Sequence, residues 1–259
     1  MHKTGVYVAK KKDGSLYYRC SLTYRGRHIS LGSFDTEKEA AMVYEKGKEV
    51  LSKDLTVNDH DDFLPLPFHK FIVLINFKDN NVYIKNPIYL MNTYIEYFLE
   101  PDIIFKFDID DLFYYSGHAI QKRGGHFFVS DYGMQVNLHS RYGIRRHAVC
   151  GRDYRFINGD RYDYRYQNIE IINCYNGVTL RKKDGRMVFR ADILINGKVK
   201  VGEYASMPEA AVAYNKACDV IMQKLPDKKY ELNYIEELSP SEYADLYTKI
   251  EISRFISEY

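Results

Sequence analysis

The chain has 259 residues, of which 46% are hydrophobic and 28% charged, with a formal net charge of +2. This length predicts one large domain or two to three small ones with buried cores. No stretch is long and apolar enough to span a bilayer, and the opening residues MHKTGVYV lack the apolar core of a signal peptide. The four cysteines form no CxxC pair, which indicates reduced thiols. We therefore expect a cytoplasmic protein and exclude a membrane protein.

Positive charge is concentrated at the start of the chain. Residues 1–34 hold seven lysines and arginines but a single acid, Asp13, whereas residues 203–259 are rich in glutamate. Charge segregated in this way indicates a polyanionic partner for the basic segment.

One basic, aromatic and glycine-punctuated sequence occurs twice. KTGVYVAKKKDGSLYYRCSLTYRGRHISLGSF begins at residue 3, and YNGVTLRKKDGRMVFRADILINGKVKVGEY begins at residue 175. In both copies a Lys-Lys-Asp-Gly turn is followed twelve residues later by a second glycine, Gly26 or Gly197. Both copies then run into Glu-Ala-Ala and a tyrosine. This coincidence indicates a duplicated module.

Each copy predicts three antiparallel strands with one apolar face. The Asp-Gly pairs mark hairpin turns, because both residue types tolerate a positive φ angle. Apolar and polar residues alternate over 18–23 and over 189–194, as they do in a half-buried strand. A third strand is predicted over 27–31 and over 198–201.

A helix is predicted after each set of strands. Thr36 with Glu39, and Ser206 with Glu209, are capping-box sequences. Small alanines then recur at helical spacing. These alanines let the helix lie close on the apolar side of the sheet, so we expect the other sheet face to be open, polar and basic.

The segments GVY, YYRCSL and GRHISLGSFDTEKEAAMVY of the first copy resemble the ethylene-response-factor (Apetala-type, GCC-box-binding) DNA-binding domain. The second copy keeps the pattern, with Val201 and Tyr204 at the Leu and Phe positions. The resemblance implies that the open sheet face enters the major groove of DNA. The family carries more Arg and Trp on this face than the first copy does. The positions implied are Tyr7, Arg19, Ser21, Thr23, His28 and Ser30, and Thr179, Arg181, Arg190, Asp192, Lys198 and Lys200.

Basic triplets at the first turn of each copy are expected to contact phosphates. Arg and Lys side chains on the open faces are expected to read guanine edges. The alternatives are a merely solvated turn and sheets that bind protein or RNA. The complete predicted DNA-binding set is Tyr7, Lys10, Lys11, Lys12, Arg19, Thr23, Arg25, Arg27, His28, Arg145, Arg146, Arg181, Lys182, Lys183, Arg186, Arg190, Lys198 and Lys200.

Residues 60–104 give weaker signals. Two prolines in FLPLPFHKFIVLINF exclude a regular central strand at its start, and His69 in this apolar run is expected in the core. NPIYLMNTYIEYFLEP fits either a short helix or a strand. Asp108, Asp110 and Asp111 precede an apolar run, which indicates a helix start more than a metal site.

The stretch INGDRYDYRYQNIEIIN resembles the HNH homing-endonuclease module of phages and bacterial mobile elements. The matching residues are Asn158, Gly159, Asp160, Asp163, Arg165, Asn168, Ile169 and Asn173. In that family a metal-binding residue and the general-base histidine come just before this stretch. The resemblance places Arg155 and Phe156 there.

The nuclease centre is therefore expected to be lost, because a phenylalanine cannot take a proton and an arginine repels a divalent cation. The catalytic candidates of an active module are His147 or His139, with Asn158 and Asn168, and its cofactor is Mg²⁺. The arginines around this stretch are expected both to pair with Asp153, Asp160 and Asp163 and to hold a DNA backbone.

Together these features predict an α+β protein in which two modules, each a three-stranded antiparallel sheet plus helix, flank a central ββα-metal (HNH-like) α+β domain. The expected boundaries are 1–58, 59–173 and 174–235, followed by a C-terminal helix within 236–259 that starts at Ser239-Pro240 and packs on the body.

The expected function is sequence-preferring binding of double-stranded DNA, by a regulator or site-binding protein of a phage or mobile element located at the nucleoid. We expect no cofactor, no metal and no membrane partner. A monomer in which each of the two modules is a DNA-binding reader fits the repeat. The alternative is a Mg²⁺-dependent HNH-type DNA endonuclease with an altered active site.

Overall fold

The computed structural model describes residues 5–146 and 148–259 and confirms the α+β class. The chain forms two compact units. The first contains the residues up to Leu138 together with 160–168, and the second contains 139–159 and 169–259. The segment predicted as a central domain, 59–173, is thus shared between the two units, and each unit is described by itself.

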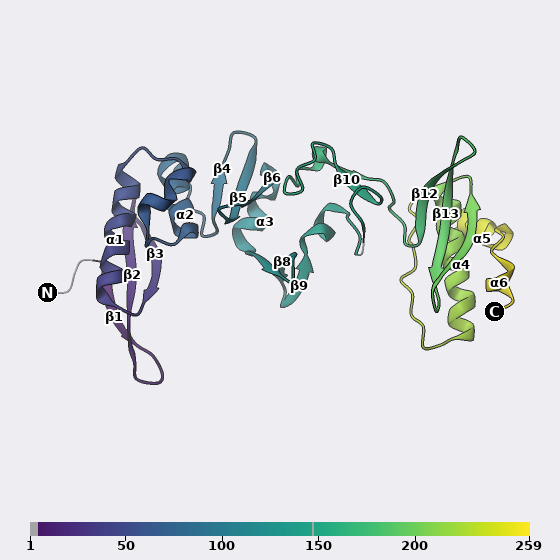
Figure 1. Ribbon diagram of the computed structural model, residues 1–259, viewed down its shortest axis with the longest axis horizontal. Helices are drawn as coiled ribbons and strands as arrows, with labels where there is room; N and C mark the ends of the chain where they lie inside the picture. The colour runs from purple at the N-terminus through teal and green to yellow at the C-terminus, as the bar shows by residue number, and fades with distance from the viewer. Residues whose placement is uncertain (1–4, 147) are drawn as a thin grey trace. The chain divides into compact units, whose positions relative to one another are not determined.

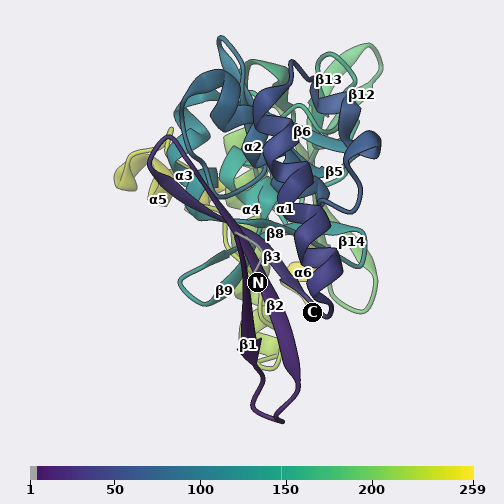
Figure 2. The ribbon, with the colours of Figure 1, turned by 90° about the vertical axis from the view of Figure 1, so that its left-hand side faces the viewer.

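The first unit begins with the sheet-and-helix module that the repeat predicts. Strands β1 (Val6–Lys10), β2 (Leu16–Tyr24) and β3 (Arg27–Phe34) form an antiparallel sheet in that order. Helix α1 (Glu37–Ser52) lies along one side of this sheet (Figure 1, Figure 2). The inner face of the sheet and the alanines of α1 are buried together, and these residues are Val6, Cys20, Leu22, Ile29, Leu31, Ala40 and Ala41.

The second unit contains the matching module. Strands β12 (Val178–Lys183), β13 (Arg186–Leu194) and β14 (Lys198–Tyr204) form the antiparallel sheet, and α4 (Met207–Lys224) covers its inner face. The register between the last two strands shifts at the same point in both sheets, after Cys20 and after Ala191. A shared β-bulge is a specific feature of a duplicated backbone.

The predicted capping sequences start both helices. Ser206 and Glu209 form the complete capping box of α4, in which each side chain meets the other residue's backbone N–H. At α1, Thr36 accepts a hydrogen bond from the backbone N–H of Glu39 at 3.2 Å.

A glycine at the start of each module lies directly under the helix tyrosine. Gly5 has φ +85° and Gly177 has φ +71°. A methyl group on Gly5 would lie 2.0 Å from the ring of Tyr44, and one on Gly177 would lie 2.2 Å from the ring of Tyr214. Both positions therefore require glycine for its left-handed backbone and for the close approach of the ring.

After α1, the next two helical segments of the first unit pack against α1 and form a second layer. The 3₁₀ helix η1 (Val57–Phe63) and α2 (Phe68–Asn80) join the core of the first module. Residues 71–77 of α2 are all buried, but His69 is exposed, so the expectation of a core histidine is wrong. His69 lies in the first turn of the helix, before the residues that the core surrounds.

Two small sheets complete the first unit. One consists of β4 (Ile88–Leu90), β5 (Tyr94–Glu100) and β6 (Ile103–Asp108), so the ambiguous stretch 86–101 is strand. The other consists of β7 (Ile120–Arg123), β8 (His126–Asp131) and β9 (Met134–Asn137). Between them, η2 (Ile109–Asp111) and α3 (Leu112–Gly117) confirm the predicted helix start.

Residues 160–168 pack against β6. The backbone N–H of Lys106 donates to the carbonyl of Tyr162 at 2.9 Å, and the N–H of Tyr164 donates to the carbonyl of Lys106 at 2.8 Å. The buried Asp163 forms an ion pair with Arg165 at 2.6 Å. The middle of the HNH-like stretch is therefore a structural part of the first unit, and it ends in the 3₁₀ turn η4 (Tyr166–Asn168).

The ends of the HNH-like stretch belong to the second unit. After the 3₁₀ turn η3 (Leu138–Tyr142), β10 (Tyr154–Phe156) pairs antiparallel with β11 (Ile169–Ile171). Within the described residues, β11 leads directly to β12, so no helix follows these two strands to complete the expected ββα unit.

The C-terminal segment packs on α4 as expected. Helix α5 (Pro240–Lys249) starts with the predicted cap at Ser239, and its half-buried tyrosines and leucine join the core of the second module. In α6 (Arg254–Ser257), Ile256 is fully buried. The N–H of Ser253 donates at 2.8 Å to the carbonyl of Val201 in the edge strand β14.

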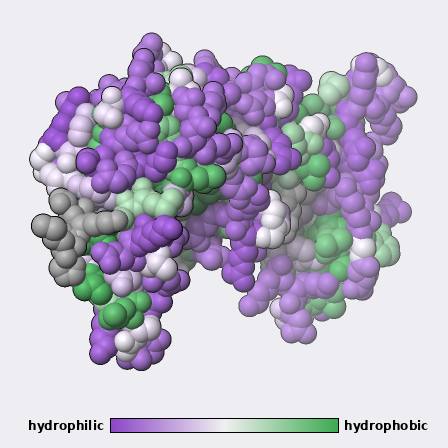
Figure 3. All heavy atoms as spheres, turned by 60° about the vertical axis from the view of Figure 1, so that its left-hand side comes forward, coloured by the Kyte–Doolittle hydropathy of each residue, from purple (hydrophilic) through white to green (hydrophobic). Residues whose placement is uncertain are grey.

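In the part of the chain that the structure describes, no helix has the length and apolar character needed to cross a membrane. Hydrophilic residues dominate the face shown in Figure 3, and hydrophobic ones appear there in small separate patches.

Replacement of Gly177 by alanine tests the contact between glycine and tyrosine. We expect Gly177→Ala to lower the free energy of unfolding by about 2–5 kcal/mol, because backbone strain and overpacking add. Gly185→Ala is the matched control, since Gly185 has φ +80° with nothing near its Cβ position, and it should cost only about 1–2 kcal/mol. Urea unfolding followed by circular dichroism gives both values, and equal losses would contradict the packing argument.

Candidate nucleic-acid interface

The outer face of the second sheet, on the side opposite α4, is dominated by cations. Register and alternation place Arg190 beside Thr179 and Glu203, and Asp192 beside Lys200. Lys182 is exposed in the strand end near the turn. The predicted residues that share the outer face are Arg181, Lys183, Arg186, Arg190, Lys198 and Lys200.

Two acids hold four of these cations in place. Asp192, with a side chain only 3% exposed, pairs with Arg190 at 2.8 Å and Lys198 at 3.2 Å. Glu203 pairs with Lys183 at 2.7 Å and with Lys200 at 2.8 Å. Hydrogen bonds from Lys183 and Lys200 lower the pKa of Glu203 to about 2. Glu203 therefore stays ionised at any physiological pH, and its ion pairs are lost only as the pH falls toward that value.

The outer face of the first sheet has different chemistry. Tyr7, Arg19, Thr23 and His28 are exposed there, as the sequence predicts. The positions that correspond to Asp192 and Glu203 are Ser21 and Ser33. A shallow depression of about 300 Å³ crosses this face and is lined by Tyr7, Arg19, Cys20, Ser21, His28 and Ser30.

Two predicted DNA contacts of the first module turn away from the open face. Arg25 donates to the side-chain oxygen of Asn81 at 2.7 Å and lies over the ring of Tyr24. The guanidinium of Arg27 lies 5.3 Å from the ring centre of Tyr83. Both arginines thus fasten the second hairpin to the segment that follows α2.

The basic turn of the first module remains open. Lys10, Lys11 and Lys12 are exposed, and Lys11 makes only a surface ion pair with Asp35 at 3.4 Å, a kind of contact that is worth little. Figure 2 shows this turn extending beyond the end of α1.

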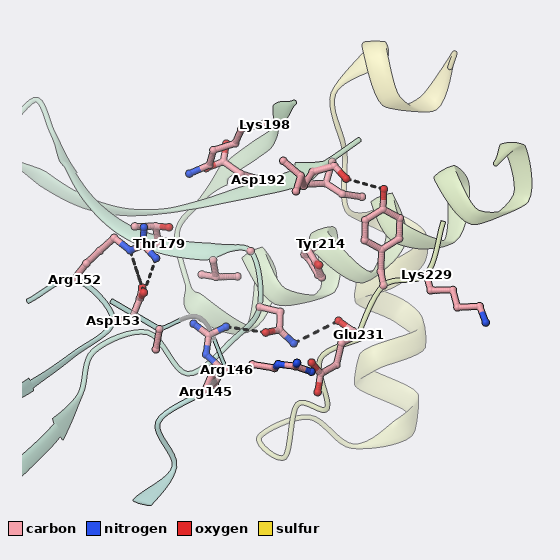
Figure 4. Close-up of a pocket in the computed structure, with 17 residues that line it drawn as sticks. Arg145, Arg146, Arg152, Asp153, Thr179, Asp192, Lys198, Tyr214, Lys229 and Glu231 are labelled. Atoms are coloured by element: carbon pink, nitrogen blue, oxygen red, sulfur yellow. Dashed lines mark hydrogen bonds and ion pairs between the residues drawn. The ribbon is translucent and has the colours of Figure 1, made fainter. Parts of the chain in front are cut away.

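A third group of cations lies beside the second sheet, around a cavity of about 510 Å³ (Figure 4). Arg146 from the loop before β10 and Lys198 from β14 both line this cavity, as does Arg152. Arg146 is exposed. Lys229 also lines the cavity, but its side chain points away from it (Figure 4).

Arg145, also predicted to bind DNA, holds this loop on the second module. It donates to the carbonyl of Asn173 at 2.9 and 3.2 Å and to the side chain of Asn176 at 3.0 Å. The side chain of Asn173 in turn accepts the N–H of Leu180 at 2.9 Å. Arg145 is therefore a positioning residue, and burial lowers its pKa.

The neighbouring Asp153 organises the same loop. It is buried, accepts the N–H of Val149 at 2.8 Å and pairs with Arg152 at 2.6 Å. Of the predicted acid pairings in this region, Asp153 with Arg152 and Asp163 with Arg165 are confirmed. Asp160 pairs with Lys106 at 3.1 Å, a partner that the sequence did not predict.

The positions that the HNH resemblance assigns to catalysis have structural partners. Arg155 pairs across the ladder with Glu170 at 2.5 Å, and Phe156 is buried against Tyr154. His139 also packs on the ring of Tyr154, at 5.5 Å between ring centres.

The two amide candidates belong to different units. The Asn168 side chain donates to the carbonyl of Asp163 at 2.8 Å within the first unit. Asn158 is exposed and belongs to the second unit, and His147 lies outside the described residues. Among residues 5–146 and 148–259, no group of three or more His, Cys, Asp or Glu side chains is placed to hold a metal ion.

Sequence reasoning missed the two anchoring acids and the cavity. The sequence predicts Asp192 on the open face but not its ion pairs, and Glu203, which lies within β14, is not among the predicted site residues. The signal for both was present, because an acid that alternates with cations on one sheet face has a cross-strand cation within reach.

Comparisons with models of known protein families, with curated proteins and with solved structures found no match to this chain.

The arrangement around Phe156 predicts no nuclease activity. We expect a supercoiled plasmid incubated with the protein and Mg²⁺ or Mn²⁺ to stay intact on an agarose gel, because position 156 offers no group that accepts a proton. Cleavage that disappears in His147→Ala would reinstate the endonuclease.

Proposed function

We propose that this protein binds double-stranded DNA with a sequence preference, as a regulator or site-binding protein of a phage or mobile element. The observation that carries the proposal is the second sheet, whose solvent-facing side bears six cations and only two acids. A sheet of two or three strands fits the major groove, and Arg or Lys side chains on it can bond the O6 and N7 atoms of guanine.

The ion pairs on this face support a role in recognition. Asp192 and Glu203 pair with four long, flexible cations before any ligand arrives. Cations that are already oriented lose less side-chain entropy on binding. The two acids also lower the net charge of the face, which reduces indiscriminate attraction to phosphate.

Phosphate contacts are proposed at two places beside the sheets. One is the basic turn 10–12 of the first module, and the other is the cavity that Arg146, Arg152 and Lys198 line. Two readers on one chain raise each other's effective concentration, so two weak sites can give one tight complex. The order of three strands and one helix in each module also supports the ethylene-response-factor resemblance.

Arg190→Ala tests the direct reading of bases. If Arg190 reads a base, its removal should cost about 1–3 kcal/mol of binding and relax the preference at one position of the site. The measurement is selection of bound duplexes from a random pool, followed by titration of the best sequence. An equal loss on every sequence would demote Arg190 to a phosphate contact.

The basic turn Lys10–Lys12 gives the matching control for Arg190, because its lysines are proposed to contact phosphates and not bases. Replacement of Lys10, Lys11 and Lys12 by alanine should weaken binding evenly on all duplexes and flatten the dependence of log K on log salt by roughly 0.9 per lost phosphate contact. An unchanged slope would remove these lysines from the interface.

Glu203→Gln tests the restraining acids. It frees Lys183 and Lys200 and adds one positive charge to the face, so binding to random duplexes should tighten while the preference for the selected site falls. Glu236→Gln makes the same charge change at an exposed position away from the sheet and should leave both quantities nearly unchanged. Equal effects of the two variants would attribute the change to net charge alone.

A further inference from the structure

The outer face of the first sheet carries two tyrosines, an exposed Tyr7 and a half-buried Tyr17, at positions where the second sheet has no aromatic residue. Tyr7 is 59% exposed and lies opposite Arg19, and Tyr17 lies opposite Ala9 on the same face. Tyr7 and Tyr17 are therefore diagonal neighbours, about 7–8 Å apart, with Arg19 next to both.

The second sheet has lost this arrangement. The register positions of Tyr7 and Tyr17 are occupied there by Thr179 and Val188, while the arginine between them is kept as Arg190. Thr179 is buried. The aromatic pair is therefore specific to the first module.

Neither ring takes part in an aromatic or cation–π contact of the described residues. Among the described residues, neither Tyr7 nor Tyr17 contacts another ring or a cation, whereas Tyr24 and Tyr83 of the same unit carry the guanidinium groups of Arg25 and Arg27. The ring of Tyr7 is thus accessible in front of the sheet, and the ring of Tyr17 is partly accessible.

The surroundings of the rings favour a polyanion. Strands β1, β2 and β3 contain no Asp or Glu at all, so an approaching phosphate meets no negative side chain on these strands. Arg19 lies between the rings, and Lys10, Lys11 and Lys12 continue the strip of positive charge to the turn.

We infer that the first sheet binds single-stranded nucleic acid, with unpaired bases stacked on Tyr7 and Tyr17 and phosphates held by Arg19 and the basic turn. Aromatic side chains beside a cationic track are the general means of holding unpaired bases. A duplex offers the sheet only base edges, because its base faces are stacked on one another. This binding goes beyond the proposed duplex binding and does not depend on it.

The test is fluorescence anisotropy with a labelled 15-nucleotide dT strand, its RNA counterpart rU, and a duplex of the same length. The full chain should bind the single strands, and Tyr7→Ala should weaken that binding roughly 5- to 100-fold, the range of one lost stacking contact. Tyr7→Phe keeps the ring and should retain most of the affinity. The ratio of the dT and rU affinities identifies which nucleic acid is the natural source.

Tyr234→Ala is the matched control, because Tyr234 is 83% exposed but lies outside both sheets. It should leave single-strand binding unchanged. No binding of either single strand, or an unchanged affinity in Tyr7→Ala, would overturn the inference. Loss of duplex binding in Arg190→Ala with normal dT binding separates the two faces, so either proposal can fail while the other stands.

Discussion

A three-stranded sheet can bury only one of its faces under a single helix, and this constraint shapes both modules. Alanines at the contact bring α1 and α4 close to their sheets, and a glycine below the helix tyrosine lets the ring lie on the backbone. These requirements fix the inner face, whereas most long side chains of the outer face stay in contact with solvent. Side chains there are free to differ, and a difference between the copies reflects what each face contacts.

The two copies show how far such surfaces can diverge on one backbone. The bulge, the register and the helix contact are the same, but Ser21 and Ser33 stand where the second copy has Asp192 and Glu203. The second face is a lattice of paired charges, whereas the first combines hydroxyls, rings and one arginine. The duplication has therefore produced two unlike surfaces on one shared backbone.

Structural features that depend only on residues close together in the sequence could be predicted from it. The turns, the alternation in β2 and β13 and the caps at Thr36, Ser206 and Ser239 each depend on neighbouring residues. Helix α2 is buried on nearly every side, so its apolar run has no period to indicate which residues face outward. The pairing of residues 160–168 with β6, and of Arg25 with Asn81, joins segments more than fifty residues apart, and no local pattern encodes such contacts.

The return of residues 160–168 to the first unit means that the chain passes between its units three times, at residues 138–139, 159–160 and 168–169. Two domains that are joined by one linker separate when that linker is cut. Here a cut at any one passage leaves parts of the same unit on both fragments, so the packing within that unit still holds the two fragments together. Residues 160–168 thus belong to one unit while their neighbours on both sides in the sequence belong to the other.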